Sequence, residues 1–368
     1  MDKNWYNISN IAAIPTPALV VYPDRVRENI RRAISIAGDA QRLRPHIKTH
    51  KCGAIIRMHL ELGVTKFKCA TIAEAEMAAT AGAKDILLAA QLVGPNVDRF
   101  GELREKFPLT MFSTICDSAE IAQALATLGE QQREPVRVYL DLNCGMDRTG
   151  IIPSSDALEL YRSIAARPNL SAAGLHAYDG HIHDGDLASR EKQFEQFNQS
   201  LVAFRTELLS KGLPVPNTVA SGTPTFALHA RQHDRECSPG TYVFWDFGYQ
   251  RYADLDFQIA ALVVTRIISK PAPNRVCLDL GHNSVASENP QPRVQFLNLP
   301  TATPVMLSEE HLVLETPDAA SWNVGDVLYG VPRHICPTVA LHDVCHPIVN
   351  STAGEPWPIE ARRRKITI

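Results

Sequence analysis

Strand-like and helix-like segments alternate along the chain from about residue 14 to residue 246. The strand-like segments include Pro17–Val21, Arg42–Thr49, Val136–Leu142 and Thr241–Trp245, and segments such as Pro23–Ala37 and Ser155–Arg167 have helical periodicity. This alternation is typical of a parallel sheet whose strands are joined by helices. About eight such units fit into about 240 residues, which is the size of a TIM (β/α)8 barrel. A doubly wound open sheet is the alternative, but no GxGxxG follows the first strand.

The pattern changes after Asp254. Short strand-like segments separated by Pro, Gly and Asn turns replace the alternation, with few helical stretches. A chain of 368 residues is also too long for one ordinary hydrophobic core. We therefore predict the α/β class, with a TIM-barrel domain at residues 1–250 and a β-rich C-terminal domain at residues 251–368.

Composition excludes several classes of protein. Hydrophobic residues make up 45% of the chain and charged residues 21%, so the chain as a whole is not disordered. The net charge is -3, and the one basic run, Arg362–Lys365, is too short for a nucleic-acid-binding patch. No stretch approaches the ~20 apolar residues that span a bilayer, and no apolar leader follows Met1. We expect a cytoplasmic protein, whose eight cysteines without a CxxC pair stay reduced.

A cluster of basic residues surrounds Lys48 at the end of a predicted strand, in the sequence RPHIKTHK. Active sites of TIM barrels lie at the carboxyl ends of the strands. Neighbouring cations and burial both favour an uncharged lysine amine, which is the form that attacks a carbonyl carbon. Lys48 is therefore a candidate nucleophile, and a solvated basic turn is the alternative.

Two further segments place polar residues at strand ends. Arg148 lies between glycines in GMDRTG, where a guanidinium could hold an anionic oxygen. Tyr178 begins YDGHIH, a crowd of polar side chains that is costly to bury without hydrogen bonds. The pair His181 and His183 has the spacing of metal ligands, but a lone HxH is weak evidence for a metal.

The loops after the last two predicted barrel strands are glycine-rich. SGTPT contains Gly222 and Thr223, and SPGTY contains Gly240 and Thr241. Phosphate sites of TIM barrels are often built from loops in this position. Backbone N–H groups at glycines and threonine hydroxyls are suitable donors to phosphate oxygens. The two loops together predict a phosphate site.

The C-terminal domain contains one motif with metal-ligand character, HICPT. On a strand, residues two apart face the same side, so His334 and Cys336 could bind one metal ion. Imidazole and thiolate favour zinc, while Mn or Mg remain alternatives. A buried cysteine beside a surface histidine is the simpler interpretation.

Taken in order, these segments resemble the D-threonine aldolase and D-serine dehydratase family, which shares the fold-type III PLP architecture with alanine racemase. The resemblance covers nearly the whole chain. It includes two further motifs, TPALVV from Thr16 and KCATIAEAE from Lys68, and it extends the SPGTY loop to SPGTYVFWD from Ser238. The ordered set is far more specific than any single motif.

The resemblance implies a role for each candidate residue. Lys48 would bond to pyridoxal 5'-phosphate (PLP), Arg148 would lie near its phenolic oxygen, and Tyr178 would lie against its pyridine ring. The phosphate would be held by Gly222, Thr223, Gly240 and Thr241, and the metal by His334 and Cys336. Two departures matter. Ser238 stands where alanine racemases have an arginine, so a cationic partner for the pyridine nitrogen is absent from that position. The second metal position is Asp or Cys within the family, and Cys336 matches the zinc-dependent dehydratases, whereas the wider sequence is more similar to the aldolases.

The resemblance also implies an activity. We expect a PLP- and metal-dependent lyase acting on D-3-hydroxy amino acids, by retro-aldol cleavage to glycine and an aldehyde. Dehydration to a 2-oxo acid and ammonia is the alternative, since a metal on the 3-hydroxyl would serve both reactions. An amino-acid racemase and a non-catalytic PLP carrier are further alternatives. A homodimer is expected, with no nucleic-acid or membrane partner.

Overall fold

The computed structural model describes residues 5–368. Contacts between residues divide the chain into two units, which we describe separately. The barrel unit comprises residues 31–48, 53–240 and 363–368, and the β-rich unit comprises residues 1–30, 49–52 and 241–362. The first helix, α1 (Pro23–Ala37), contributes residues to both.

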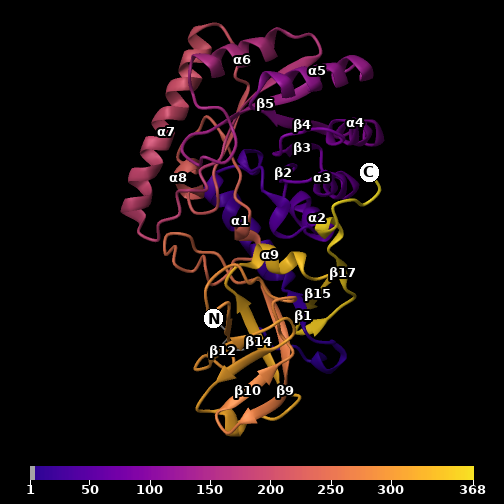
Figure 1. Cartoon of the computed structure of the whole chain (residues 1–368), viewed down its shortest axis with the longest axis vertical. Helices are drawn as coiled ribbons and strands as arrows, with labels where there is room; N and C mark the ends of the chain where they lie inside the picture. Colours follow the sequence, from indigo (N-terminus) through magenta and orange to yellow (C-terminus); the bar gives the residue numbers. More distant parts are fainter. Residues whose placement is uncertain (1–4) are drawn as a thin grey trace. The chain divides into compact units, whose positions relative to one another are not determined.

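The barrel unit contains seven parallel strands in sequential order, each hydrogen-bonded to the next. They are β2 (Lys66–Cys69), β3 (Asp85–Leu88), β4 (Met111–Cys116), β5 (Val136–Leu142), β6 (Leu170–Ala177), β7 (Asn217–Ala220) and β8 (Glu236–Cys237). Helix α2 (Gly53–Glu61) precedes β2, and the helices between the strands are α3 (Ile72–Thr80), α4 (Asn96–Lys106), α5 (Ala119–Gln132), α6 (Ser155–Ala166), α7 (Leu187–Ser210) and α8 (Phe226–Ala230) (Figure 1). The predicted TIM-like α/β fold is confirmed.

A short segment takes the place of an eighth strand. Leu43 pairs with Cys237 of β8 and His46 pairs with Lys68 of β2, both in parallel. The buried Arg44 stabilises this closure, since its guanidinium lies 2.6 Å from Glu236 and 2.7 Å from Asp85. The predicted strand at 42–49 is therefore only a pair of bridges, followed by the 3-10 turn Ile47–Thr49 that carries Lys48.

Local sequence signals explain several helix ends in the barrel unit. Ser118 caps α5, and its hydroxyl accepts the N–H of Ile121 at 3.3 Å, as expected for an N-cap serine. Gly82 follows α3 with φ +103°, a conformation that glycine adopts without strain. Leu87, Ile115, Tyr139, Ala173 and Val219 come from five neighbouring strands and form a buried cluster in the core.

The β-rich unit is built on a second sheet. Its strands are β1 (Ala18–Val21), β9 (Ala261–Ala272), β10 (Arg275–Leu278), β11 (Val294–Phe296), β12 (Thr303–Leu307), β13 (Leu312–Glu315), β14 (Val327–Pro332), β15 (Val344–Val349), β16 (Thr352–Ala353) and β17 (Trp357–Pro358). The main order is β12-β13-β10-β9-β1-β15-β16, and β14 pairs with both β9 and β11. One short helix, α9 (Ile335–Ala340), follows β14.

Two predicted barrel strands are wrong. The segment at Pro17–Val21 does form a strand, but β1 pairs with β9 and β15 of the β-rich unit instead of opening the barrel. The segment Thr241–Trp245 is not a strand, because Thr241–Val243 forms a 3-10 turn. The last barrel strand is the two-residue β8, which ends before Pro239 and Gly240.

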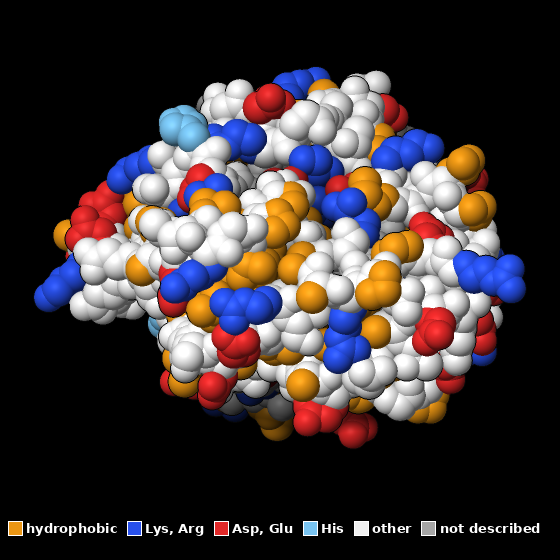
Figure 2. Space-filling view, turned by 90° about the horizontal axis from the view of Figure 1, so that it is seen from above, with side chains coloured by type: hydrophobic (Ala, Val, Ile, Leu, Met, Phe, Trp, Pro, Cys, Tyr) orange, Lys and Arg blue, Asp and Glu red, His pale blue; other side chains and the backbone are white. Residues whose placement is uncertain are grey.

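On the face shown in Figure 2, basic and acidic side chains are interspersed with hydrophobic ones. The long helix α7 buries Phe194, Phe197 and Leu201 along one side. Among residues 5–368, every helix is too short or too polar to cross a membrane.

Candidate functional site

A small pocket lies where strands of the barrel unit end. Its lining combines His46, Lys48, Lys68, Ala89, Arg148, His176 and Tyr178. Lys68 and His176 come from β2 and β6, and Lys48 follows the closing segment. Three of the predicted residues, Lys48, Arg148 and Tyr178, are thus brought together.

Three basic side chains lie around the ring of Tyr178. The Nζ atoms of Lys48 and Lys68 lie 5.6 Å and 5.7 Å from the ring centroid, and the Arg148 guanidinium carbon lies 5.2 Å from it. No acidic side chain is among the residues that line this pocket. A cationic, acid-free pocket with an aromatic wall suits a flat anionic ligand. The donor set therefore fits PLP.

Lys68 is a site residue that the sequence did not single out, although it begins the KCAT motif. Its side chain is buried at 1% exposure, and its Nζ lies 3.5 Å from His176 Nε2. His176 Nδ1 in turn lies 2.6 Å from Asp141 Oδ1. Burial, and then the charge of Lys48, lower the pKa of Lys68 to about 7.

The predicted phosphate loops are held by hydrogen bonds inside the barrel unit. The Gly240 N–H donates to the Thr223 hydroxyl at 3.0 Å, which brings the two loops together. The Gly222 N–H donates to Asp179 Oδ1 at 2.8 Å. If the hydrogen bond between them broke, the Gly240 N–H and the Thr223 hydroxyl could both donate to a phosphate. The Gly222 N–H already donates to the carboxylate of Asp179.

Asp179 fixes this arrangement. Besides Gly222, it accepts a hydrogen bond from His229 Nε2 at 2.8 Å, and both side chains are buried. Although burial opposes its charge, the contact with His229 holds the pKa of Asp179 below its ordinary value. A charged carboxylate with two buried donors is an anchor for the loop that starts at Ser221.

We expect the substitution Asp179→Ala to destabilise the protein by about 3 kcal/mol, because two buried donors would lose their acceptor. Denaturant unfolding measures this change. The matched control is Asp156→Ala, since Asp156 is an exposed aspartate at the start of α6. A similar loss in both variants would contradict the anchoring role.

Gly180 is required by the position of Tyr178. A Cβ atom at residue 180 would lie 2.3 Å from Tyr178 Cε1, which is far inside van der Waals contact. Gly180→Ala is therefore expected to move the Tyr178 ring away from the three basic side chains of the pocket. We expect this change to weaken PLP binding by about tenfold or more. Gly354→Ala, whose Cβ would meet nothing nearer than 3.7 Å, is the control. Equal PLP affinity in the two variants, measured by equilibrium titration, would show that the ring position is unimportant.

The second group of candidates lies in the β-rich unit. Cys336 Sγ lies 3.1 Å from the Thr49 hydroxyl and 3.6 Å from the Thr241 hydroxyl. His334 is hydrogen-bonded to Cys336, and its Nδ1 lies 2.5 Å from Glu288 Oε1. The predicted metal pair is thus in contact, and the sequence did not single out Glu288 or Thr49.

The strand predicted for His334 and Cys336 is wrong. His334 and Cys336 are not on a strand, because β14 ends at Pro332. His334 is the N-cap residue of α9 and Cys336 lies in its first turn. The buried Asp246 holds this helix start, since it accepts the Ile335 N–H at 3.0 Å.

The chemistry of this pair suits a divalent metal. Burial opposes a charge on either side chain, but their mutual hydrogen bond lowers the pKa of Cys336 and raises that of His334 to about 9. A thiolate beside an imidazole is a zinc-type donor pair. Glu288 on His334 Nδ1 is the carboxylate contact that commonly orients a metal-binding histidine.

The protein supplies few ligands here. Among residues 5–368, no three His, Cys, Asp or Glu side chains gather as a complete metal cage. A two-ligand site keeps open positions, which is characteristic of catalytic metals. The other histidine pair is not a cage either, since His183 Nδ1 contacts the backbone oxygen of His181.

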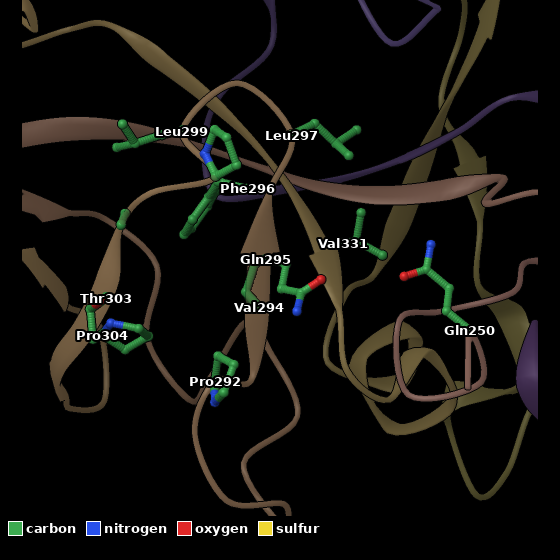
Figure 3. Close-up of a pocket in the computed structure, with 12 residues that line it drawn as sticks. Gln250, Pro292, Val294, Gln295, Phe296, Leu297, Leu299, Thr303, Pro304 and Val331 are labelled. Atoms are coloured by element: carbon green, nitrogen blue, oxygen red, sulfur yellow. The ribbon is translucent and has the colours of Figure 1, made fainter. Parts of the chain in front are cut away.

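A larger pocket in the β-rich unit, of about 570 Å³, has a different character. Val294, Phe296, Leu297, Leu299 and Val331 line it, together with the amide of Gln250 (Figure 3). None of its lining residues is titratable. It therefore offers no acid, base or nucleophile, and the catalytic candidates remain the two groups above.

Two family models match the chain. The alanine racemase N-terminal domain matches residues 21–246, and a serine dehydratase domain matches residues 260–348. The first covers more than half of the chain and includes Lys48, Arg148 and Tyr178. The second includes His334 and Cys336.

Proteins of known activity are similar over nearly their whole length. A D-threonine aldolase from Arthrobacter sp is 31% identical, over 96% of this chain and 94% of that protein. The 3-hydroxy-D-aspartate aldolase of Paracoccus denitrificans is 26% identical, over 95% and 92%. The D-threo-3-hydroxyaspartate dehydratase of Delftia sp. is 26% identical, over 94% and 97%.

Solved structures agree with these relatives. The D-threonine aldolase from Filomicrobium marinum superposes with a TM-score of 0.89 at 26% identity, covering 97% of this chain and 98% of that one. An alanine racemase from Clostridium difficile superposes with a TM-score of 0.71 at 11% identity, over 94% and 99%, and shares the fold. The chain therefore belongs to the family that joins an alanine racemase-type N-terminal domain to a serine dehydratase-type C-terminal domain, the family of the D-threonine aldolases.

Proposed function

We propose that this chain is a PLP-dependent lyase of D-3-hydroxy amino acids that uses a divalent metal. One observation carries the proposal: Lys48, Lys68 and Arg148 surround the Tyr178 ring in an acid-free pocket at the strand ends of the barrel unit. The relatives of this chain include two aldolases and a dehydratase of D-3-hydroxy amino acids, which supports this substrate class.

Each residue has a proposed task toward PLP. Lys48 would bond to its aldehyde carbon, Arg148 would bind its phenolic oxygen, and Tyr178 would pack on its ring. Thr223, Gly240 and Thr241 would donate to its phosphate, and Gly222 would keep the loop in place through Asp179. PLP itself supplies an electron sink for the bond that breaks at Cα.

His334 and Cys336 would hold the metal, and Glu288 would orient His334. The metal would supply a Lewis acid for the substrate's 3-hydroxyl. Zinc fits the thiolate best, and Mn or Mg are the alternatives. The related Delftia dehydratase has been solved in a metal-free form in which a cysteine is replaced by alanine.

Retro-aldol cleavage to glycine and an aldehyde is the proposed reaction, because the D-threonine aldolase from Arthrobacter is 31% identical to this chain, whereas the Delftia dehydratase is 26% identical. Dehydration to a 2-oxo acid and ammonia is the second candidate, favoured by the cysteine at the second metal position. Both reactions develop negative charge on the same 3-hydroxyl oxygen, so one metal could serve either.

Product identification tests the proposal. The protein, loaded with PLP and zinc, is incubated with D-threonine, D-serine and D-3-hydroxyaspartate, and with the L-isomers as controls. Glycine plus an aldehyde establishes the aldolase, and ammonia plus a 2-oxo acid establishes the dehydratase. No turnover of any D-isomer overturns the lyase assignment.

Two rival functions have distinct signatures. A racemase would exchange the α-proton of alanine without metal. A PLP carrier resembles a lone barrel, whereas this chain also matches the serine dehydratase domain at residues 260–348. We also propose a domain at residues 1–250 and a second at residues 251–368. One family model matches within each of them. A homodimer and a cytoplasmic location complete the proposal.

A further inference from the structure

The proposed function leaves one buried group of the pocket without a task, the amine of Lys68. The side chain is 1% exposed, and a lysine buried to this degree normally has a carboxylate partner. Its hydrogen-bond partner here is the imidazole of His176, at 3.5 Å. Among residues 5–368, no carboxylate lies within ion-pair distance of this amine.

The imidazole cannot neutralise an ammonium group. Burial lowers the pKa of His176, so the ring is uncharged near neutral pH. Its Nδ1–H donates to Asp141 at 2.6 Å, which leaves the lone pair of Nε2 facing Lys68. Whether Lys68 is an amine or an ammonium group, His176 Nε2 therefore accepts one of its N–H groups. This hydrogen bond orients the Lys68 amine.

The charges around Lys68 come from several elements. Lys48 and Arg44 disfavour a positive charge on the amine, and Asp179 and Asp141 favour it. Arg148 and Lys68 both lower the pKa of His176. With burial as the largest effect, the pKa of Lys68 falls to about 7, so a small change in local charge alters its protonation.

We propose that Lys68 is a second functional lysine of this pocket, an amine that takes up a proton when an anionic oxygen enters and then binds it as an ammonium group. The inference rests on the proposed function, since the anionic oxygen would belong to the cofactor or to the carboxylate of the amino acid. Lys48 and Lys68 then have separate tasks: one forms a covalent bond, and the other binds charge.

The direction of the pH effect follows from linkage. An anion beside Lys68 stabilises the ammonium form and raises its pKa above the value in the free protein. Between those two values, binding takes up a proton, and affinity for the anion rises as pH falls. Without Lys68, this uptake would be lost.

Carbon-13 NMR of the full chain labelled at the lysine ε-carbons tests the proposal. The Lys68 resonance is assigned by its absence in Lys68→Met, or in Lys68→Arg if the first variant does not fold. Each sample is titrated with acid and base, alone and with pyridoxine 5'-phosphate, which lacks the aldehyde and cannot bond to Lys48. We expect the Lys68 midpoint to rise by about one pH unit or more when the probe binds.

Two arms distinguish the source of the anionic oxygen. A rise with pyridoxine 5'-phosphate alone assigns it to the cofactor, and a rise that also requires D-threonine assigns it to the amino acid. The exposed Lys84 is the internal control and should titrate identically in all samples. A Lys68 midpoint in the ordinary lysine range, or one that neither ligand moves, overturns the proposal.

The outcome is separable from that of the proposed function. Borohydride trapping of PLP, followed by peptide mass mapping, reports whether Lys48 forms the covalent bond. If PLP is trapped at Lys48 and the titration midpoint of Lys68 does not change with either ligand, only the inference about Lys68 is refuted. A ligand-dependent rise in the midpoint without turnover of any D-isomer refutes only the lyase assignment.

Discussion

Lys48→Ala is expected to abolish the visible absorbance of enzyme-bound PLP and to lower turnover of D-3-hydroxy amino acids by about 10³-fold or more. The amine is the group that bonds to the cofactor in our proposal, and alanine leaves nothing to replace it. Absorbance spectra and borohydride trapping report the bond to PLP, and product assays report turnover. Lys84→Ala removes an exposed lysine of the same unit and should change none of them.

Lys48→Arg separates bond formation from charge. Arginine keeps the positive charge beside Tyr178, but its guanidinium stays protonated and is not a nucleophile. We expect PLP to bind this variant without forming the covalent bond. An unchanged spectrum in either variant would refute the assignment of Lys48. If borohydride trapped PLP at Lys68 in the wild type, Lys68 would be the lysine that bonds to PLP.

The part of the site that could be predicted depends on one topological rule. Lys48, Arg148 and Tyr178 lie far apart in the sequence, yet each follows a predicted strand, and parallel strands bring their carboxyl ends together. The structure places all three on one pocket. The rule holds although the strand before Lys48 is reduced to two bridges, because Leu43 and His46 still pair with both edge strands of the barrel.

Lys68 was missed because strand alternation does not show which face points inward. In β2, with sequence KFKC, Lys66 and Lys68 share a face, and both would be expected at a solvent-exposed surface. Lys66 instead reaches Glu236, 2.6 Å away, and Lys68 lies in the pocket. The available signal was a lysine one residue before the carboxyl end of a barrel strand, between the buried residues Phe67 and Cys69.

Errors in the predicted elements have two causes. The strand β1 was placed in the wrong sheet because its partners, β9 and β15, lie more than 200 residues away, and no local pattern encodes such a pairing. The HICPT motif was taken for a strand although it contains Pro337, a residue that is tolerated in the first turn of a helix and rare within a sheet. That proline was the sign that α9 begins at Ile335.

His334→Ala is expected to remove the metal and to lower turnover by about 100-fold or more while PLP stays bound. The metal would lose one of its two protein ligands, whereas the residues proposed for PLP are unchanged. Metal content by mass spectrometry and the absorbance of bound PLP are measured on the same sample. Full activity in a metal-free sample, prepared with a chelator, would contradict a catalytic metal.

Cys336→Asp tests which metal the site selects. A carboxylate keeps a negative ligand at this position but replaces a soft sulfur by a hard oxygen, so preference should move from zinc toward manganese or magnesium. We expect the wild type to be most active with zinc, and the variant to lose at least about tenfold in zinc affinity and to gain activity with manganese. Cys345→Ala, at a buried cysteine of β15, is the control for the loss of a thiol. If the order of metals is the same in both proteins, the thiolate of Cys336 does not bind the catalytic ion. The short contacts from Thr49 and Thr241 to its sulfur would then reflect packing at the start of α9.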